Sequence, residues 1–210
     1  MSAQSARDTV ILLHGIWMRA AVTRQLATRL TTAGFDVRRI DYSSVFGPFD
    51  QHFERIDAQM RGAGSGKVHL VGHSLGGVLA MQYLRQRQPQ SSGRVVCLGS
   101  PLLGSRLAQR LQRAGLAKLS LGHAREALTQ ALPDWDGSRE VGVIAGTLAL
   151  GLGLILGPLG EDCDGTVAVS ETRLPGIHDH LSLRVSHTGL LYSARAADAT
   201  VRFLREGRFT

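Results

Sequence analysis

The chain has 210 residues, of which 43% are hydrophobic and 20% charged, and this balance excludes an intrinsically disordered protein. Its formal charge of +7 would suit a nucleic-acid or anionic-lipid partner. The basic residues, however, are spread from Arg7 to Arg208 without a run of five like charges or a nucleic-acid-binding motif, so no nucleic-acid partner is expected.

Short apolar runs rich in β-branched residues alternate along the chain with segments of helical period. Strands are expected over 10–13, 36–42, 67–71, 95–98, 141–145 and 181–185. Helices are expected over 22–33, 49–60, 75–87, 102–132 (with a break near 119–122) and 190–204. This alternation predicts an α/β fold, a doubly wound and mostly parallel six-stranded sheet with helices on both faces, in one domain over 1–210.

Two features bear on a membrane contact. Arg106, Arg110 and Arg113 share one helical face, which is typical of a solvated face and also fits a weak peripheral contact with an anionic membrane or ligand. The segment 141–160 carries no charge, but its glycines and proline argue against a spanning helix. A buried strand followed by an apolar loop is expected there, and a flap over 148–159 that touches lipid or an acyl chain is the alternative.

The two cysteines, Cys97 and Cys163, provide neither a disulfide framework nor metal-ligand spacing, so no metal is expected. Cys163 lacks the strand–turn–helix setting of a nucleophile and is interpreted as a structural residue. Residues 1–9 lack the apolar core of a signal peptide, and the expected location is the cytoplasm.

A Gly-x-Ser-x-Gly element, with Ser74 at its centre, lies directly between an expected strand and an expected helix. In that setting, Gly72 and Gly76 let strand and helix pass closely while the turn exposes the hydroxyl at a helix N-terminus, where developing negative charge is stabilised. A glycine-rich turn would explain the glycines but not the serine between them. Ser74 is therefore the predicted nucleophile.

A serine nucleophile needs a base, and the expected chain order is serine, acid, histidine. His187 follows the last expected strand, at its carboxyl end, and is the predicted base. His178 and His180 precede that strand and so belong to the opposite edge, while His123 lies in a helical stretch before any suitable acid. A loop histidine that only caps a helix is the alternative for His187.

The orienting carboxylate is sought in an acidic cluster made by Glu161, Asp162 and Asp164. Asp164 is preferred because the following Gly165 allows a turn that aims the carboxylate inward, and Asp162 is the alternative. The chosen carboxylate should reach the imidazole of His187 and fix its tautomer.

An oxyanion hole needs two convergent N–H donors. The backbone of Leu75, directly after the nucleophile, is one expected donor, and Ile16 in the loop after the first strand is the other. Trp17 is expected to form a wall of the acyl pocket or, equally, to serve plain packing.

These elements together resemble the α/β-hydrolase family, particularly its small bacterial lipases and esterases, and also hydrolases similar to GPI-inositol deacylases. The matching stretches are Val-Ile-Leu-Leu-His-Gly at 10–15, Gly-His-Ser-Leu-Gly-Gly at 72–77, Gly-Ser-Pro-Leu-Leu-Gly-Ser at 99–105, Asp-Gly-Thr-Val at 164–167 and Ser-His at 186–187. The second stretch is specific, and the others are weak alone but persuasive together.

The resemblance implies a minimal core of that fold, a triad of Ser74, Asp164 and His187, acyl-enzyme chemistry and no cofactor. It also implies that the stretch 99–105 lines the site, with Leu102 and Leu103 against the substrate. The chain departs from larger members in lacking two N-terminal antiparallel strands and a substantial cap, so only 102–132 and 148–159 are available as a modest cover.

The expected function is cleavage of a small-molecule or lipid carboxylic ester through an acyl-enzyme on Ser74. A thioesterase or acyltransferase on the same fold is an alternative, and so is a non-catalytic module that binds lipid or acyl groups. The physiological ester and the oligomeric state are left open by the sequence.

Overall fold

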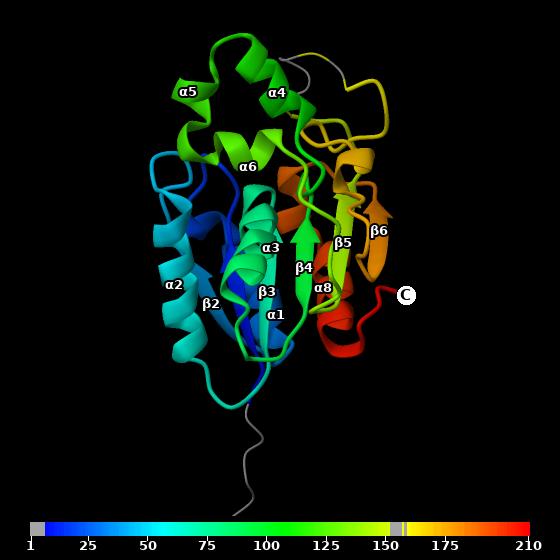
Figure 1. Cartoon of the computed structure of the whole chain (residues 1–210). Coiled ribbons are helices and arrows are strands. Elements are labelled where there is room, and N and C mark those ends of the chain that lie inside the picture. The colour runs from blue at the N-terminus through cyan, green and yellow to red at the C-terminus, as the bar shows by residue number, and fades with distance from the viewer. Residues whose placement is uncertain (1–6, 152–156, 158) are drawn as a thin grey trace, which may run out of the picture.

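The structure, a computed structural model, describes residues 7–151, 157 and 159–210. It contains a six-stranded sheet in the order β2-β1-β3-β4-β5-β6, in which all neighbouring strands are parallel. The carboxyl ends of all strands therefore meet at one edge, the upper edge of the sheet in Figure 1. The strands are β1 (Thr9–Leu13), β2 (Asp36–Ile40), β3 (Val68–His73), β4 (Val95–Leu98), β5 (Val141–Gly146) and β6 (Asp179–Leu183).

The four inner strands are buried along their whole length, whereas β2 and β6 at the two edges are partly exposed. Burial on both faces explains why the inner strands have nearly continuous apolar sequences rather than alternating ones. The prediction of a doubly wound, mostly parallel sheet is confirmed, and the sheet is parallel throughout. The single-domain organisation stays a prediction.

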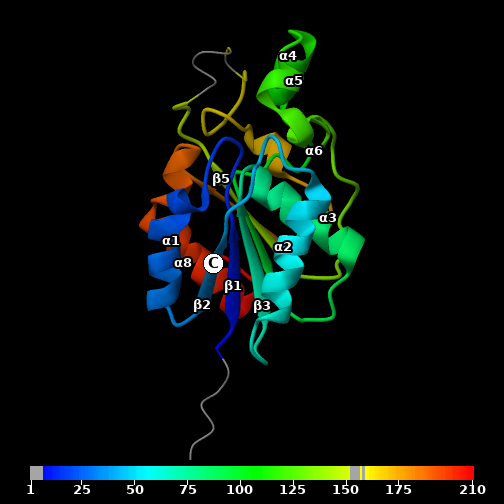
Figure 2. The same ribbon diagram turned by 90° about the vertical axis from the view of Figure 1, so that its left-hand side faces the viewer.

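Helices cover both faces of the sheet (Figure 2). One face carries α1 (Arg24–Thr32) and α8 (Ala194–Glu206), which bury Leu30, Phe203 and Leu204 against the strands. The other carries α2 (Phe49–Arg61) and α3 (Leu75–Arg87). Short 3₁₀ helices join these parts, namely η1 (Ala20–Thr23), η2 (Gly122–Ala124), η3 (Val169–Thr172) and η4 (Thr188–Leu191).

The chain between β4 and β5 forms three short helices, α4 (Arg106–Arg113), α5 (Ala117–Ser120) and α6 (Arg125–Thr129), above the carboxyl edge of the sheet (Figure 1). The sequence predicted one long helical stretch there with a single break. The stretch divides because Gly115 and Gly122 have φ angles of 72° and 53°, a conformation that ends a helix. These helices cover the site described below.

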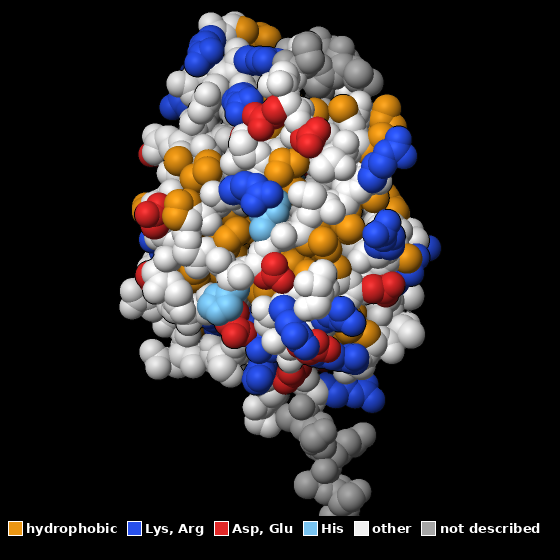
Figure 3. All heavy atoms as spheres, turned by 90° about the vertical axis from the view of Figure 1, so that its right-hand side faces the viewer, with side chains coloured by type: hydrophobic (Ala, Val, Ile, Leu, Met, Phe, Trp, Pro, Cys, Tyr) orange, Lys and Arg blue, Asp and Glu red, His pale blue; other side chains and the backbone are white. Residues whose placement is uncertain are grey.

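The arginine stripe on α4 is not simply a solvated face. The side chain of Arg106 pairs with Glu161 and donates to Ser170 Oγ at 3.0 Å, and Arg110 Nη1 donates to the carbonyl of Gly157 at 2.7 Å. Two of the three guanidinium groups thus hold the loop that precedes β6, and Arg113 is exposed. On the face over β6, cationic and anionic side chains are interspersed (Figure 3).

The expected apolar loop over 148–159 includes residues 152–156 and 158, which lie outside the described residues. The expectation of a flap that touches lipid therefore stays a prediction. Within the described ranges, no helix is both long and apolar enough to cross a membrane.

Buried histidines on β3 predict a pH-dependent stability. Burial lowers the pKa of His69 to about 4 and that of His73 to about 3, from an ordinary value of 6.5. At a pH between the lowered pKa of the folded chain and the ordinary pKa of 6.5, the unfolded chain binds protons that the folded chain does not. The free energy of unfolding therefore falls as pH decreases. We expect a loss of up to about 1.4 kcal/mol per pH unit for each histidine between about pH 6.5 and 4.5. Urea titrations at pH 7.5, 6.0 and 5.0 measure it, and a constant or rising stability would contradict it.

Candidate active site

Ser74 lies on a sharp turn between β3 and α3. Its backbone angles are φ 54° and ψ −122°, a region that residues other than glycine rarely adopt. Its N–H donates to the carbonyl of Leu98 on β4 at 2.8 Å, which fastens the turn to the neighbouring strand. Ser74 is 5% exposed, and its hydroxyl makes no hydrogen bond to any described residue.

Two glycines make this turn possible because the backbones around it almost touch. A Cβ built on Gly72 would lie 2.3 Å from the carbonyl carbon of Gly76, and one on Gly76 would lie 2.4 Å from the carbonyl oxygen of Leu13. Side chains at these positions would push α3 away from β3 and β1. The setting that the sequence predicted for Ser74 is therefore present, and its steric reason is visible.

The predicted acid and base are in contact. His187 Nδ1 donates to Asp164 Oδ2 at 2.7 Å, and the backbone N–H of His187 donates to the Asp164 carbonyl at 2.9 Å. The other carboxylate oxygen, Oδ1, accepts from the backbone N–H groups of Thr166 (2.9 Å) and Val167 (2.7 Å). With Nδ1 protonated, the Nε2 lone pair of His187 is free to accept a proton.

The alternative acids do not make this contact. Asp162 is exposed, and Glu161 pairs with Arg106 and accepts from Ser170 Oγ at 2.9 Å. Gly165 has a φ of 91°, and a Cβ there would meet the backbone of Leu150 at 2.4 Å, so the Asp-Gly turn requires this glycine.

Contacts with residues at the ends of β3 and β4 place His187 beside the Gly-x-Ser-x-Gly turn at 72–76, which is called the elbow below. The ring of His73, the residue before Ser74, lies 4.7 Å from the ring of His187 between centroids. At the end of β4, a Cβ on Gly99 would lie 2.9 Å from Asp164 Oδ2 and 3.2 Å from His187 Nδ1. Serine, imidazole and carboxylate thus gather at the carboxyl edge. The absence of a hydrogen bond between Ser74 and His187 is common before a substrate binds.

The two predicted oxyanion donors flank Ser74. Leu75 is the first residue of α3, so its N–H has no acceptor within the helix. A Cβ on Gly15 would lie 3.1 Å from Ser74 Cβ, which places the loop after β1 against the nucleophile. The N–H of Ile16 makes no hydrogen bond to the described residues, whereas that of Trp17 donates to Ser44 Oγ at 3.0 Å. The amide of Ile16 is therefore available to an acceptor, whereas that of Trp17 is already engaged.

A narrow cavity of about 30 Å³ opens beside Ser74. Ile16 and Trp17 line one side of it, and Trp17 is half exposed while its indole N–H donates to the carbonyl of Ser120 at 2.7 Å. The remaining walls come from the connection between β4 and β5 and from the turn that follows Asp164. They are formed by Pro101, Ser105, Leu107, Ala108, Leu111, Leu121, Leu128, Thr166 and Val167.

The residues expected to contact substrate in the stretch 99–105 are placed differently from one another. Leu102 is fully buried in the core, and Leu103 packs against that core from its edge. The cavity beside Ser74 is lined by Pro101 and Ser105 from this stretch instead. The expected cover over 102–132 thus provides part of the wall, but the individual residues from α4 and α6 were not predicted, although the spacing of Leu107 and Leu111 is a helical apolar signal.

The remaining candidate histidines lie elsewhere. His178 Nε2 is 3.8 Å from Glu140, the residue before β5, so it belongs to the opposite edge of the sheet, as expected. His180 lies inside β6, which begins two residues earlier than predicted, and its ring bonds Thr172 Oγ1 at 2.8 Å.

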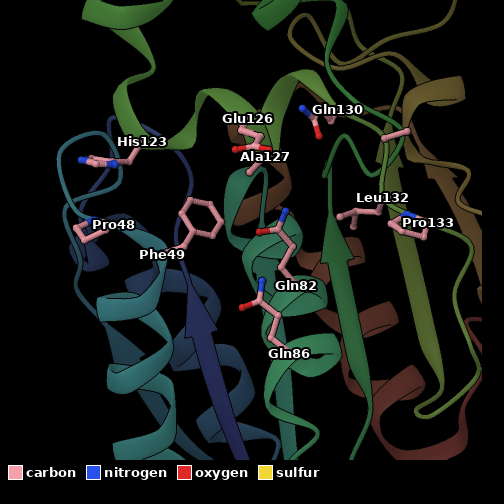
Figure 4. A pocket seen from close by; sticks show the side chains of 11 residues that line it. Pro48, Phe49, Gln82, Gln86, His123, Glu126, Ala127, Gln130, Leu132 and Pro133 are labelled. Carbon is pink, nitrogen blue, oxygen red and sulfur yellow. The ribbon is translucent and has the colours of Figure 1, made fainter.

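A larger groove of about 390 Å³ lies between α2, α3 and α6 (Figure 4). His123 and Glu126 line it from above, and Gln82 and Gln86 line it from α3. It contains none of the predicted nucleophile, acid or base. The candidate active site is therefore the narrow cavity at Ser74.

The sheet is parallel throughout, and a strained serine lies between one of its strands and the following helix. A hydrogen-bonded histidine and aspartate lie beside that serine. This combination is typical of α/β hydrolases. A family model described as the alpha/beta hydrolase family matches residues 10–205. The chain belongs to the alpha/beta hydrolase family. No curated protein matches it by sequence.

Several solved structures share the fold. A lipase of Bacillus licheniformis, BlEst2 in mature form, is 20% identical with a TM-score of 0.71, covering 96% of this chain and 92% of its own. The metagenomic carboxyl esterase MGS0156 is 14% identical with a TM-score of 0.68, covering 88% and 65%. The type II thioesterase BorB from the borrelidin biosynthetic cluster is 17% identical with a TM-score of 0.65, covering 98% and 94%.

The close approach of β3 and α3 predicts a sharp difference between two glycine-to-alanine variants. Gly72→Ala should lower the free energy of unfolding by about 2–3 kcal/mol, because its methyl group meets backbone atoms that have no room to shift. Gly64→Ala is the matched control, since nothing lies within 4 Å of a Cβ there. Urea unfolding of both variants measures the difference, and equal stability would contradict the described packing.

Proposed function

We propose that this protein hydrolyses carboxylic esters through an acyl-enzyme on Ser74. The observation that carries the proposal is the 2.7 Å bond between His187 Nδ1 and Asp164, at the same sheet edge as the strained Ser74. Asp164 is 1% and His187 7% exposed, so a charge pair formed there is shielded from water.

In the proposed first step, Ser74 Oγ attacks the ester carbonyl carbon while His187 Nε2 accepts the hydroxyl proton. The carbonyl oxygen becomes an oxyanion and accepts hydrogen bonds from the N–H groups of Ile16 and Leu75. The tetrahedral intermediate expels the alcohol, which takes the proton from His187, and an acyl-serine remains.

Water then attacks the acyl-serine while His187 again accepts a proton. Collapse of the second intermediate releases the carboxylic acid and returns the proton to Ser74. Asp164 stays ionised throughout and stabilises the imidazolium. Apart from the ester and one water molecule, the proposed chemistry uses side chains and backbone amides of this chain.

The substrate of this acyl transfer is proposed to be an oxygen ester, since a lipase and a carboxyl esterase are among the similar structures. A thioesterase is also among them, so hydrolysis rates for oxygen and thio esters of one acyl group decide between the two. A faster thioester reaction, at matched leaving-group pKa, would replace the ester proposal with the thioesterase alternative.

The decisive experiment concerns Ser74→Ala. A fluorophosphonate probe should label the wild type and leave the variant unlabelled, and hydrolysis of p-nitrophenyl acetate should fall to background, because no other hydroxyl occupies the elbow. Circular dichroism and urea unfolding provide the folding control. Labelling or turnover that persists in folded Ser74→Ala would refute the proposal, and an unlabelled wild type would favour a non-catalytic module.

The proposed acid can be tested with matched variants at two aspartates that are two residues apart. Asp164→Asn should lower kcat by about 10³–10⁴-fold, because an amide cannot stabilise the imidazolium and favours the wrong tautomer. Asp162→Asn removes an exposed carboxylate from the same loop and should leave kcat unchanged. Steady-state kinetics of both variants measure this, and a reversed order would transfer the role to Asp162.

A further inference from the structure

A second imidazole lies at the candidate site, and the mechanism proposed above gives it no task. His73 ends β3 directly before Ser74, and its side chain is 1% exposed. Its Nε2 lies 2.9 Å from the backbone carbonyl oxygen of His187. A carbonyl oxygen only accepts, so the proton of His73 is on Nε2 and this group is the donor.

Three hydrogen bonds fix His187, and they come from two different parts of the chain. Its ring Nδ1 and its backbone N–H both bind Asp164. Its carbonyl oxygen accepts from His73. Throughout the described residues, this third bond is the one hydrogen bond that joins the His187 segment to the strand carrying Ser74.

A packing role alone does not account for an imidazole at this position. His73 Nδ1 is buried, and no described residue bonds it. A lone pair that loses water without gaining a donor costs free energy, and an apolar side chain of similar size would avoid that cost. Nearby, a Cβ on Gly15 would lie 3.1 Å from this nitrogen, so the loop after β1 closes the space around it.

The surroundings also keep this donor neutral. Burial and, to a smaller extent, the charges of His187 and His14 lower the pKa of His73 to about 3, although Asp164 and the bond to the His187 carbonyl oppose this. The ring therefore remains an uncharged donor at neutral pH. It adds no positive charge beside the imidazolium that the proposed mechanism forms on His187.

We propose that His73 is a positioning residue, which holds His187 at the correct distance from Ser74 through the hydrogen bond from its Nε2–H to the His187 carbonyl oxygen. This inference rests on the proposed function of Ser74 and His187. The bonds to Asp164 set the direction of the His187 imidazole, and the bond from His73 sets its distance from β3, the strand that leads into Ser74. Without that bond, the ring and the backbone N–H of His187 are still bound to Asp164, but no hydrogen bond among the described residues joins His187 to β3.

Two polar variants separate this role from packing. His73→Gln places an amide N–H near the position of Nε2 and should keep kcat for p-nitrophenyl acetate within about threefold of the wild type. His73→Asn carries the same amide one methylene shorter, does not reach the His187 carbonyl, and should lower kcat by about 10–100-fold, because small misplacements of a base are costly. KM should change less than about twofold in both variants.

His69 offers the matched control. It is a buried histidine on the same strand, about 13 Å from His73, and it bonds the N–H of Arg94 rather than the site. His69→Asn should reduce stability and leave kcat of the folded fraction unchanged. Because a purely structural His73 would behave in the same way, equal effects of His73→Asn and His69→Asn on kcat would overturn the inference.

A second readout is independent of turnover. In a Ser74→Ala background, the NMR signal of the His187 Nδ1 proton should keep its position with His73→Gln and shift or broaden with His73→Asn. If the signal responds in this way while the Ser74-containing protein shows no esterase activity, the proposed function fails and the positioning stands. If the protein is an active esterase and the two His73 variants agree in both kcat and the His187 signal, the positioning role is refuted.

Discussion

The separation between β3 and α3 is the constraint on which the rest of the site depends. Gly72 and Gly76 bring backbone atoms so close that no side chain fits, and the turn between them forces Ser74 to φ 54°. Strain of this kind persists only where the surroundings determine it completely. Here the fully buried strand β3, the buried first turns of α3 and the bond from Ser74 N–H to β4 provide that determination.

Buried charge around this turn is compensated group by group. Asp164 is 1% exposed and receives one ring N–H and two backbone N–H groups, which offset much of the cost of removing its carboxylate from water. Glu171 is 4% exposed, and burial raises its pKa, while the N–H groups of Arg106 and Ala168 donate to it at 2.7 and 2.9 Å. The Glu171 carboxylate therefore holds the start of α4 against the loop that contains Asp164 and Ala168.

The sequence allowed the sheet, the sharp turn at Ser74 and the contact between Asp164 and His187 to be predicted, because each depends on local pattern or on chain order. A strand, a glycine-bounded serine and a helix follow one another directly in the sequence. Asp164 and His187 could be selected because each follows a strand, and the carboxyl ends of parallel strands share one edge.

Features that depend on contacts between distant segments could not be predicted in this way. The apolar period of 102–132 indicated helices and a possible cover but not which leucines would face Ser74, so Leu107, Leu111 and Leu128 were not identified as wall residues. The partners of Arg106 lie more than fifty residues away, and this made the stripe look solvated. The contact of His73 with His187 spans 114 residues and leaves no local signal.

Much of the apolar wall of the cavity comes from one segment of the chain, the connection between β4 and β5. α4 and α6 both lie in the connection between β4 and β5, and they supply apolar wall without supplying any of the proposed reacting groups. Replacing wall side chains there changes the shape of the cavity while the turn at Ser74 and its glycines keep their geometry. The part of the wall that comes from α4 and α6 can therefore change in sequence independently of the turn at Ser74, whereas the part from Ile16, Thr166 and Val167 is tied to the loops around Ser74 and Asp164.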